Sequence, residues 1–344
     1  MQPHQVSKAR QWLAMCGSLL LLSAACCFLH SPESAALSAV QADEDHFHQF
    51  KLKYAKEYYS EEEHSYRFQH FRSNLAYVRL HNAQSHAFVV GLTKFADLST
   101  EEFTAMYTSP RLGSVQRRES RLETTEIPEE VDWVAAGAVA PIQNQVFCGS
   151  CWAFAATGAV ESAYFLQSGQ LTPLSQQQLL DCSQLFGTSG CDGGEMVDAY
   201  SYIIAQGGLE TAQEYPYEAK DGKCRLNGSQ PIAAISSFTS IEKGSSAQLK
   251  LAVAQQPVSV GVQANEKVWQ MYESGVMDSD CGQRLNHAVL VVGYGREDGL
   301  DYWLVKNTWG EDWGIEGYVK ILRDDESTDG GLCGIALDAS YPTF

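Results

Sequence analysis

Two cysteines three positions apart stand at the start of a predicted helix, and the second is placed to act as a nucleophile. The chain reads Q-V-F-C-G-S-C-W from Gln145, so the pair is Cys148 and Cys151. The residues from Trp152 to about 168 are Ala-rich and stop at Gly169, which predicts a buried helix beginning at or beside Cys151. A thiol attacks only as the thiolate, and unpaired N–H groups at a helix start favour that anion. The pattern therefore predicts a nucleophilic thiol.

Two other chemistries use the same spacing. A Cys-x-x-Cys pair also occurs in zinc knuckles and in redox-active sites. A redox pair usually lies in a βαβ context, and a zinc site needs a second ligand pair at short spacing; we find neither pattern here. Either alternative predicts a labile disulfide between Cys148 and Cys151, or a metal bound by them.

Three segments together resemble the papain-like cysteine proteases of the cathepsin L-like subfamily. Cys-Gly-Ser-Cys-Trp at 148–152 is a signature of that family, His287 stands in L-N-H-A-V-L-V-V-G-Y-G, and Asn307 stands in K-N-T-W-G. The resemblance implies a Cys151 thiolate paired with a His287 imidazolium, which gives its proton to the leaving amine. It also implies that Asn307 orients the imidazole, that Trp309 shields this pair, and that Gln145 donates to the oxyanion together with the Cys151 N–H.

Val146 departs from the family pattern beside the nucleophile, because the family usually has Gly there. A β-branched residue is costly at this position if the backbone needs a positive φ. An alternative function is therefore a catalytically silent homologue that binds peptides or proteins. The intact Cys151, His287, Asn307 and Gln145 favour the enzyme.

The resemblance also implies a substrate cleft. Gly193 and Gly194 correspond to the backbone edge that pairs with an extended peptide. The pocket for the second residue before the cut is expected to be lined by Met196, Gly261, Ala288 and Asp338. The small and apolar members predict Leu, Val or Phe in the substrate, and Asp338 predicts some tolerance of Arg.

Cysteine usage indicates an oxidising compartment. Cys16, Cys26 and Cys27 lie in the N-terminal leader, and seven cysteines follow residue 147, an odd number that predicts three disulfides and one free thiol. The resemblance supplies the pairs: Cys148 with Cys191, Cys182 with Cys224, and Cys281 with Cys333. Asn227 opens a glycosylation sequon in a polar loop.

The chain divides into three predicted parts. Residues 1–42 have the basic start, apolar run and small residues of a signal peptide, with cleavage near Ala42; an uncleaved anchor is the alternative, because the apolar run is about as long as a minimal membrane span. In residues 43–126, Glu63, Arg67, Phe71, Asn74, Val78 and Asn82 recur on one face of a long helix, as in cathepsin L-type propeptides. Gly91, Phe95 and Asp97 resemble the second propeptide motif, with Thr93 in place of the usual Asn. Residues 127–344 correspond to the mature peptidase.

The fold class follows from a change of pattern near residue 206. Ser175 with Gln178 predicts a helix that begins with a capping box, and a further helix is expected from about Met196 to Gly207. The Val/Ile/Tyr-rich runs 257–264, 287–294, 302–306 and 318–322 predict strands. A helical half followed by a β-rich half fits an α+β, two-lobed papain-like fold. Residues 108–126 show no apolar periodicity and predict an exposed linker, which in the family runs backwards through the cleft.

The charge distribution limits the partners. From residue 127 onward there are 28 acidic and 11 basic residues, a surface that repels nucleic acid and anionic lipid. We expect no metal or cofactor, and no membrane association after signal cleavage. The resemblance implies a monomer of the secretory pathway, destined for a lysosome, a vacuole or the exterior. Its partners would be protein and peptide substrates, its own propeptide, and cystatin-type inhibitors.

Overall fold

The computed structural model describes residues 32–109, 112, 119–226, 228, 230–279 and 281–344. They belong to two compact units, residues 1–72 and 73–344. The first 31 residues of the predicted signal peptide lie outside the described residues, and the predicted cleavage site near Ala42 falls within helix α2 (Pro32–Lys53). No helix in the described part of the chain is both long enough and apolar enough to cross a membrane.

The first unit contains α2 and the first half of α3 (Glu61–Asn82). Phe47 and Phe50 of α2 pack on Phe71 of α3, with ring centroids 5.0 and 5.2 Å apart. Arg72 Nε lies 3.2 Å from a carboxylate oxygen of Asp43. The long helices predicted in this region are confirmed, and one face of each is buried by aromatic side chains.

The second unit begins with the remainder of α3 and contains the other helices and all described strands. The helices are α4 (Thr100–Tyr107), α5 (Cys151–Ser168), α6 (Gln176–Cys182), α7 (Met196–Gln206), α8 (Ser246–Val253) and α9 (Lys267–Met271). Short 3-10 helices are η1 (Gln184–Phe186), η2 (Gly190–Asp192) and η3 (Leu332–Gly334). The strands are β1 (Phe88–Val90), β2 (Glu119–Ser120), β3 (Val131–Asp132), β4 (Ser237–Ile241), β5 (Val258–Val262), β6 (Tyr272–Met277), β7 (His287–Glu297), β8 (Leu300–Lys306), β9 (Tyr318–Leu322) and β10 (Ala339–Thr343).

One sheet joins these strands in the order β1-β6-β9-β8-β7-β5-β10-β4-β2, with β3 paired to β7. Pairing is antiparallel except between β6 and β9 and between β2 and β4. Strands β1 and β2 both precede residue 127 and occupy the two ends of this path. The predicted propeptide region therefore covers both edges that the later strands would leave unpaired.

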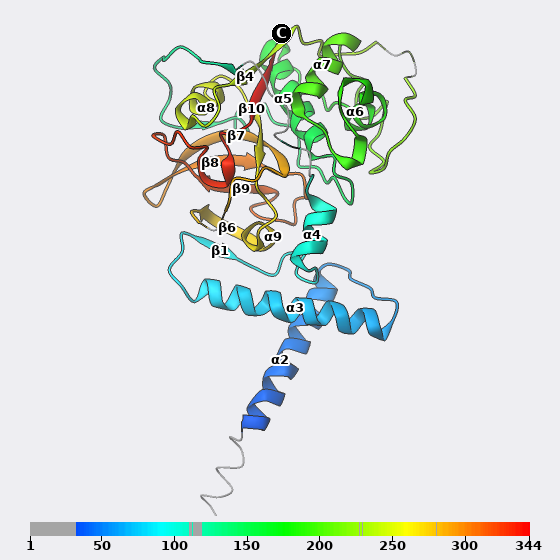
Figure 1. The fold of residues 1–344 in the computed structure, drawn as a ribbon, viewed down its shortest axis with the longest axis vertical. Coiled ribbons are helices and arrows are strands. Elements are labelled where there is room, and N and C mark those ends of the chain that lie inside the picture. The colour runs from blue at the N-terminus through cyan, green and yellow to red at the C-terminus, as the bar shows by residue number, and fades with distance from the viewer. Residues whose placement is uncertain (1–31, 110–111, 113–118, 227, 229, 280) are drawn as a thin grey trace, which may run out of the picture. The chain divides into compact units, whose positions relative to one another are not determined.

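The helical and β-rich halves are separate layers of the second unit. Figure 1 shows α5, α6 and α7 together on one side and the strands β6 to β9 on the other. Helix α5 is buried from Cys151 to Ala163 because Ala and Gly let neighbours approach closely; a Cβ built on Gly158 would lie 3.0 Å from Leu290 of β7. This contact shows that the middle of α5 packs directly on β7.

The predicted helix ends are confirmed. Gly169 and Gly207 both adopt left-handed conformations, at φ 74° and 76°, and close α5 and α7. The hydroxyl of Ser175 caps α6 by accepting from the Gln178 N–H. The Gln178 side chain does not complete the capping box by accepting from the Ser175 N–H. It accepts from the N–H of Glu210 and donates to the Tyr202 hydroxyl.

The exposed linker predicted for residues 108–126 is wrong at its start. Thr108 and Ser109 are buried, as is Leu112, which joins the core formed by α5, α6, α7 and β7. Glu119 and Ser120 pair with β4. Arg117 and Arg118 lie outside the described residues. The polar composition concealed these contacts because a segment that binds a cleft through its backbone needs no apolar period.

Candidate active site

Cys151 is the first residue of α5 and the one free cysteine among the described residues. Ser150 precedes it as the N-cap residue, without a side-chain capping bond. The thiol is fully buried in this propeptide-bound chain, and burial raises its pKa from 9.0 to about 11, against an opposing effect of the backbone amides of Ala288, Trp152 and Cys151 itself. The helix start therefore favours the anion, as expected, but desolvation outweighs it here.

His287 begins β7 and is held by Asn307, which follows β8. The His287 Nε2 lies 2.7 Å from the Asn307 Oδ1, and both side chains are fully buried. Because the amide oxygen can only accept, Nε2 carries the proton. The other ring nitrogen, Nδ1, has no hydrogen-bond partner in the described part of the chain. This tautomer leaves Nδ1 as the atom able to take a proton from a thiol.

Tryptophans enclose the imidazole. The Trp309 ring stacks on His287 with centroids 4.7 Å apart, and Trp269 meets His287 edge-on at 6.4 Å. Burial lowers the pKa of His287 from 6.5 to about 4, and the bond to Asn307 offsets only part of that effect. The structure therefore holds a neutral thiol and a neutral imidazole, which differs from the ion pair that the family resemblance implies. Both charged forms are disfavoured because no solvent reaches either group.

Gln145 is fixed at three points beside Cys151. Its backbone N–H donates to the Thr308 carbonyl at 2.8 Å, and its side-chain oxygen accepts from the Thr308 hydroxyl at 2.6 Å. The Nε2 group donates one proton to the Cys148 carbonyl at 2.9 Å. An amide NH₂ has two protons, so a second donor remains on Gln145. The sequence gives no signal for the contact between Thr308 and this side chain.

Val146 adopts φ 56°, in the left-handed region that disfavours β-branched residues. Its N–H donates to the Asn144 side chain at 2.9 Å, which helps to hold the conformation. Val146 therefore has the positive φ that the sequence analysis identified as costly for a β-branched residue. A left-handed conformation of this kind costs about 1–3 kcal/mol.

Of the residues predicted to line the cleft, Gly194 lies against Trp152, and Gly261 lies beside Ala288 and Asp338. Gly193 adopts φ 113°, and a Cβ on Gly194 would lie 2.7 Å from the Trp152 ring, so both positions require Gly. Gly261 pairs with Ala288 across β5 and β7, and its N–H donates to the Asp338 carbonyl at 2.8 Å. The four residues predicted to line the specificity pocket are all buried: Met196, Gly261, Ala288 and Asp338.

Residues from the segment before residue 127 pack against Asn286 and Trp309. The N–H of Ser109 donates to the Asn286 carbonyl at 2.6 Å, directly before His287. The rings of Phe95 and Phe103 meet Trp309 edge-on at 5.8 and 5.1 Å. Sequence reasoning missed Ser109 and Phe103 because neither belongs to a motif; only the buried face of α4 marks Phe103.

Disulfides join Cys148 to Cys191, Cys182 to Cys224, and Cys281 to Cys333. The first pair holds the loop before Cys151 to η2, so Cys148 and Cys151 do not pair with each other. Asn227 lies outside the described residues. Among the described residues no cluster of His, Cys, Asp and Glu is arranged to hold a metal ion.

Comparisons with known proteins agree with this geometry. Residues 127–343 match the papain family cysteine protease model, and residues 47–103 match the cathepsin propeptide inhibitor domain. The oryzain beta chain of Oryza sativa subsp. japonica is 44% identical over 82% of this chain. The probable cysteine protease RDL2 of Arabidopsis thaliana is 42% identical over 86% of this chain and 84% of its own length. This chain spans only 62% of the length of the oryzain beta chain.

Solved structures give the same result. The recombinant stem bromelain precursor superposes with a TM-score of 0.81 at 36% identity, over 88% of this chain and 99% of that one. Digestive procathepsin L 3 of Tenebrio molitor larval midgut superposes with a TM-score of 0.79 at 38% identity, over 88% of this chain and 99% of that one. The two-lobed α+β fold with a helical propeptide is thereby confirmed. The chain belongs to the papain family of cysteine proteases and carries a cathepsin propeptide inhibitor domain ahead of its peptidase domain.

Proposed function

We propose that this chain is the zymogen of a cysteine endopeptidase that uses Cys151, His287 and Asn307 to hydrolyse peptide bonds. The observation that carries the proposal is the buried bond from His287 Nε2 to Asn307 Oδ1, which directs the basic Nδ1 away from Asn307. In the open enzyme, solvent and the mutual attraction of the charges favour a Cys151 thiolate and a His287 imidazolium.

The reaction then follows from the positions of these atoms. The Cys151 sulfur adds to the scissile carbonyl carbon, and the carbonyl oxygen takes the negative charge. The second proton of Gln145 Nε2 and the Cys151 N–H stabilise this oxyanion. His287 gives its proton to the leaving amine, an acyl-enzyme forms, and water activated by the neutral imidazole hydrolyses it.

Acid activation is supported by the buried histidine. The pKa of His287 is about 4 in the closed chain and 6.5 in the absence of burial. An opened cleft therefore binds more protons than the closed one between those values. The closed form loses stability as pH falls through this window, because the opened form takes up a proton that the closed form does not. Each unit of pKa difference is worth about 1.4 kcal/mol.

The cleft supports a preference for Leu, Val or Phe two residues before the cut. Gly261, Ala288 and Met196 provide the apolar part of that pocket, and Asp338 provides a carboxylate that would accept Arg. Asp338→Ala is expected to lower the ratio of Arg to Leu cleavage. An unchanged ratio would remove Asp338 from the specificity pocket.

The remaining assignments are also part of the proposal. The mature enzyme acts as a monomer on proteins and peptides in a lysosome, a vacuole or the exterior, and cystatin-type inhibitors block its cleft. The signal peptide spans residues 1–42, the propeptide 43–126 and the mature domain 127–344. Asn227 is the proposed glycosylation site.

The test is cleavage of a fluorogenic peptide with Leu two residues before the cut, at about pH 5 with a thiol reductant, after acid activation. Wild type should cleave it and Cys151→Ala should not, because only the thiolate can form the acyl-enzyme. Val146, at φ 56°, is the one observation that favours a silent homologue. A correctly processed wild-type enzyme without activity would support that alternative.

A further inference from the structure

Tyr217 contacts both ends of the loop 145–151, which carries the proposed oxyanion donors. It belongs neither to the proposed catalytic triad nor to any of the sequence motifs described above. Its hydroxyl donates to the Gln145 carbonyl at 2.8 Å. The same hydroxyl lies 2.6 Å from the Ser150 Oγ. A carbonyl can only accept, so the phenol proton points to Gln145 and the Ser150 hydroxyl donates to Tyr217. Thus a single oxygen connects the residue before Val146 to the residue before Cys151.

We propose that Tyr217 is a positioning residue, which sets the spacing between the Gln145 side-chain donor and the Cys151 N–H in the oxyanion hole. The inference rests on the proposed function. The two donors come from residues 145 and 151, and the loop between them includes the disulfide-bonded Cys148. The Tyr217 bridge closes this loop at its base, so both donors keep one geometry when the oxyanion forms.

The strain at Val146 makes this bridge necessary. The Gln145 carbonyl belongs to the peptide unit that leads into Val146, which adopts φ 56°. A β-branched residue is driven out of that conformation, and rotation of the peptide would turn the Gln145 carbonyl away. The hydrogen bond from Tyr217 opposes this rotation.

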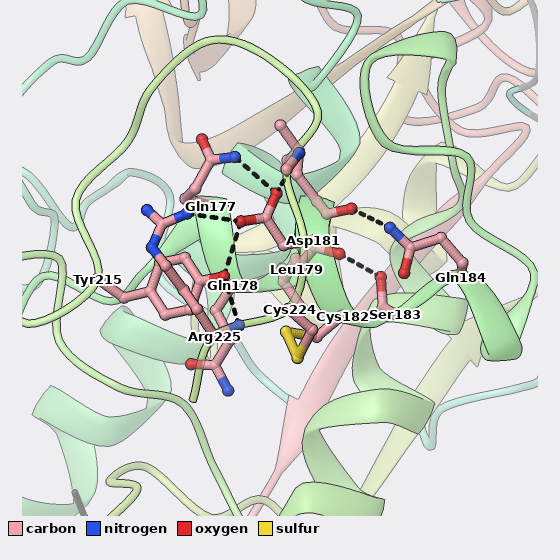
Figure 2. The surroundings of a disulfide bond; sticks show 12 residues. Gln177, Gln178, Leu179, Asp181, Cys182, Ser183, Gln184, Tyr215, Cys224 and Arg225 are labelled. Atoms are coloured by element: carbon pink, nitrogen blue, oxygen red, sulfur yellow. Dashed lines mark hydrogen bonds and ion pairs between the residues drawn. A yellow bond between two sulfur atoms is a disulfide. The ribbon is translucent and has the colours of Figure 1, made fainter. Parts of the chain in front are cut away.

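Tyr217 is itself rigidly held. Its ring meets Phe154 of α5 edge-on at 4.9 Å. Two residues earlier, the Tyr215 hydroxyl donates to the buried Asp181 carboxylate at 2.7 Å, and Arg225 contacts the same carboxylate at 3.1 Å. Figure 2 shows both bonds reaching the Asp181 carboxylate, near the disulfide of Cys182 with Cys224.

The hydroxyl also stays protonated at any working pH of the enzyme. Burial raises the pKa of Tyr217 to about 12, with smaller effects from Ser150 and Cys151. A neutral phenol can donate to a carbonyl, whereas a phenolate cannot. The bridge is therefore intact across the range in which the protease is expected to work.

The test compares two reactions of the enzyme that is obtained by acid activation of the full chain. Peptide hydrolysis develops an oxyanion, whereas alkylation by iodoacetamide does not. In alkylation the Cys151 sulfur forms a bond to the CH₂ carbon as the carbon–iodine bond breaks, and iodide leaves. Tyr217→Phe should lower kcat by about 10²-fold with KM nearly unchanged, the usual effect of misplacing a catalytic donor. The alkylation rate should stay within about twofold of wild type. Ser150→Ala should reproduce the loss of kcat in weaker form.

Tyr294→Phe is the matched control. The Tyr294 hydroxyl also donates to a backbone carbonyl, that of Pro128 at 2.9 Å, and it touches none of the proposed site residues. Its kcat should equal that of wild type. The inference is overturned if Tyr217→Phe retains wild-type kcat, or if hydrolysis and alkylation fall together. A wild-type enzyme that is alkylated but hydrolyses no peptide would overturn the proposed function as well.

Discussion

The His287 Nε2 lies 2.7 Å from the Asn307 Oδ1, and neither atom is exposed to solvent. Two segments that are 20 positions apart in the chain thus meet at the ends of the paired strands β7 and β8. Trp309 stacks on the imidazole and keeps water from competing for this bond. The orientation of His287 is therefore set before any substrate arrives.

Asn307→Ala should lower kcat/KM of the activated enzyme by about 10²-fold, because the imidazole loses its orienting partner. Asn307→Asp should act differently. A carboxylate 2.7 Å from Nε2 favours the imidazolium, so the pKa of His287 rises and the alkaline limb of the kcat/KM profile moves to higher pH. The measurement is a pH profile of peptide hydrolysis. An unchanged profile for Asn307→Asp would contradict the assigned role.

The zymogen should be chemically silent at neutral pH as well as sterically blocked. The pKa of Cys151 is about 11 and that of His287 about 4, so both groups are neutral between these values. Alkylation of Cys151 in the zymogen should therefore be slow at about pH 6 and accelerate as pH rises toward 11. In the activated enzyme the rate should already be high near pH 6. Equal rates for the two forms at that pH would show that the propeptide does not desolvate the thiol.

Much of this site could be predicted from sequence because its residues lie in short motifs. Helix α5 (Cys151–Ser168) could be predicted from its composition and from Gly169 after it, and the strand at His287 from its Val-rich run. The hydroxyl bridge of Tyr217 could not be predicted, since it joins residues 67 and 72 positions apart through single atoms. The neutral state of Cys151 also depends on the burial of its thiol in the folded chain, which no local pattern records.

The propeptide contacts were the least predictable part of the fold. Strands β1 and β2 are three and two residues long, too short for a periodic signal. Ser109 binds the Asn286 carbonyl through its backbone N–H, and a backbone bond leaves no trace in side-chain type. By contrast, the spacing of Phe71 and Asn74 on α3 did predict a helix with one buried face.

Val146→Gly should stabilise the protein. Glycine adopts φ 56° without steric cost, so the gain is the strain energy of about 1–3 kcal/mol less about 1 kcal/mol for the greater flexibility of the unfolded chain. The measurement is the free energy of unfolding from denaturant titration of the zymogen. Val89→Gly is a matched control, because Val89 is also exposed but has a negative φ, and it should destabilise. Equal losses for both variants would show that Val146 is not strained.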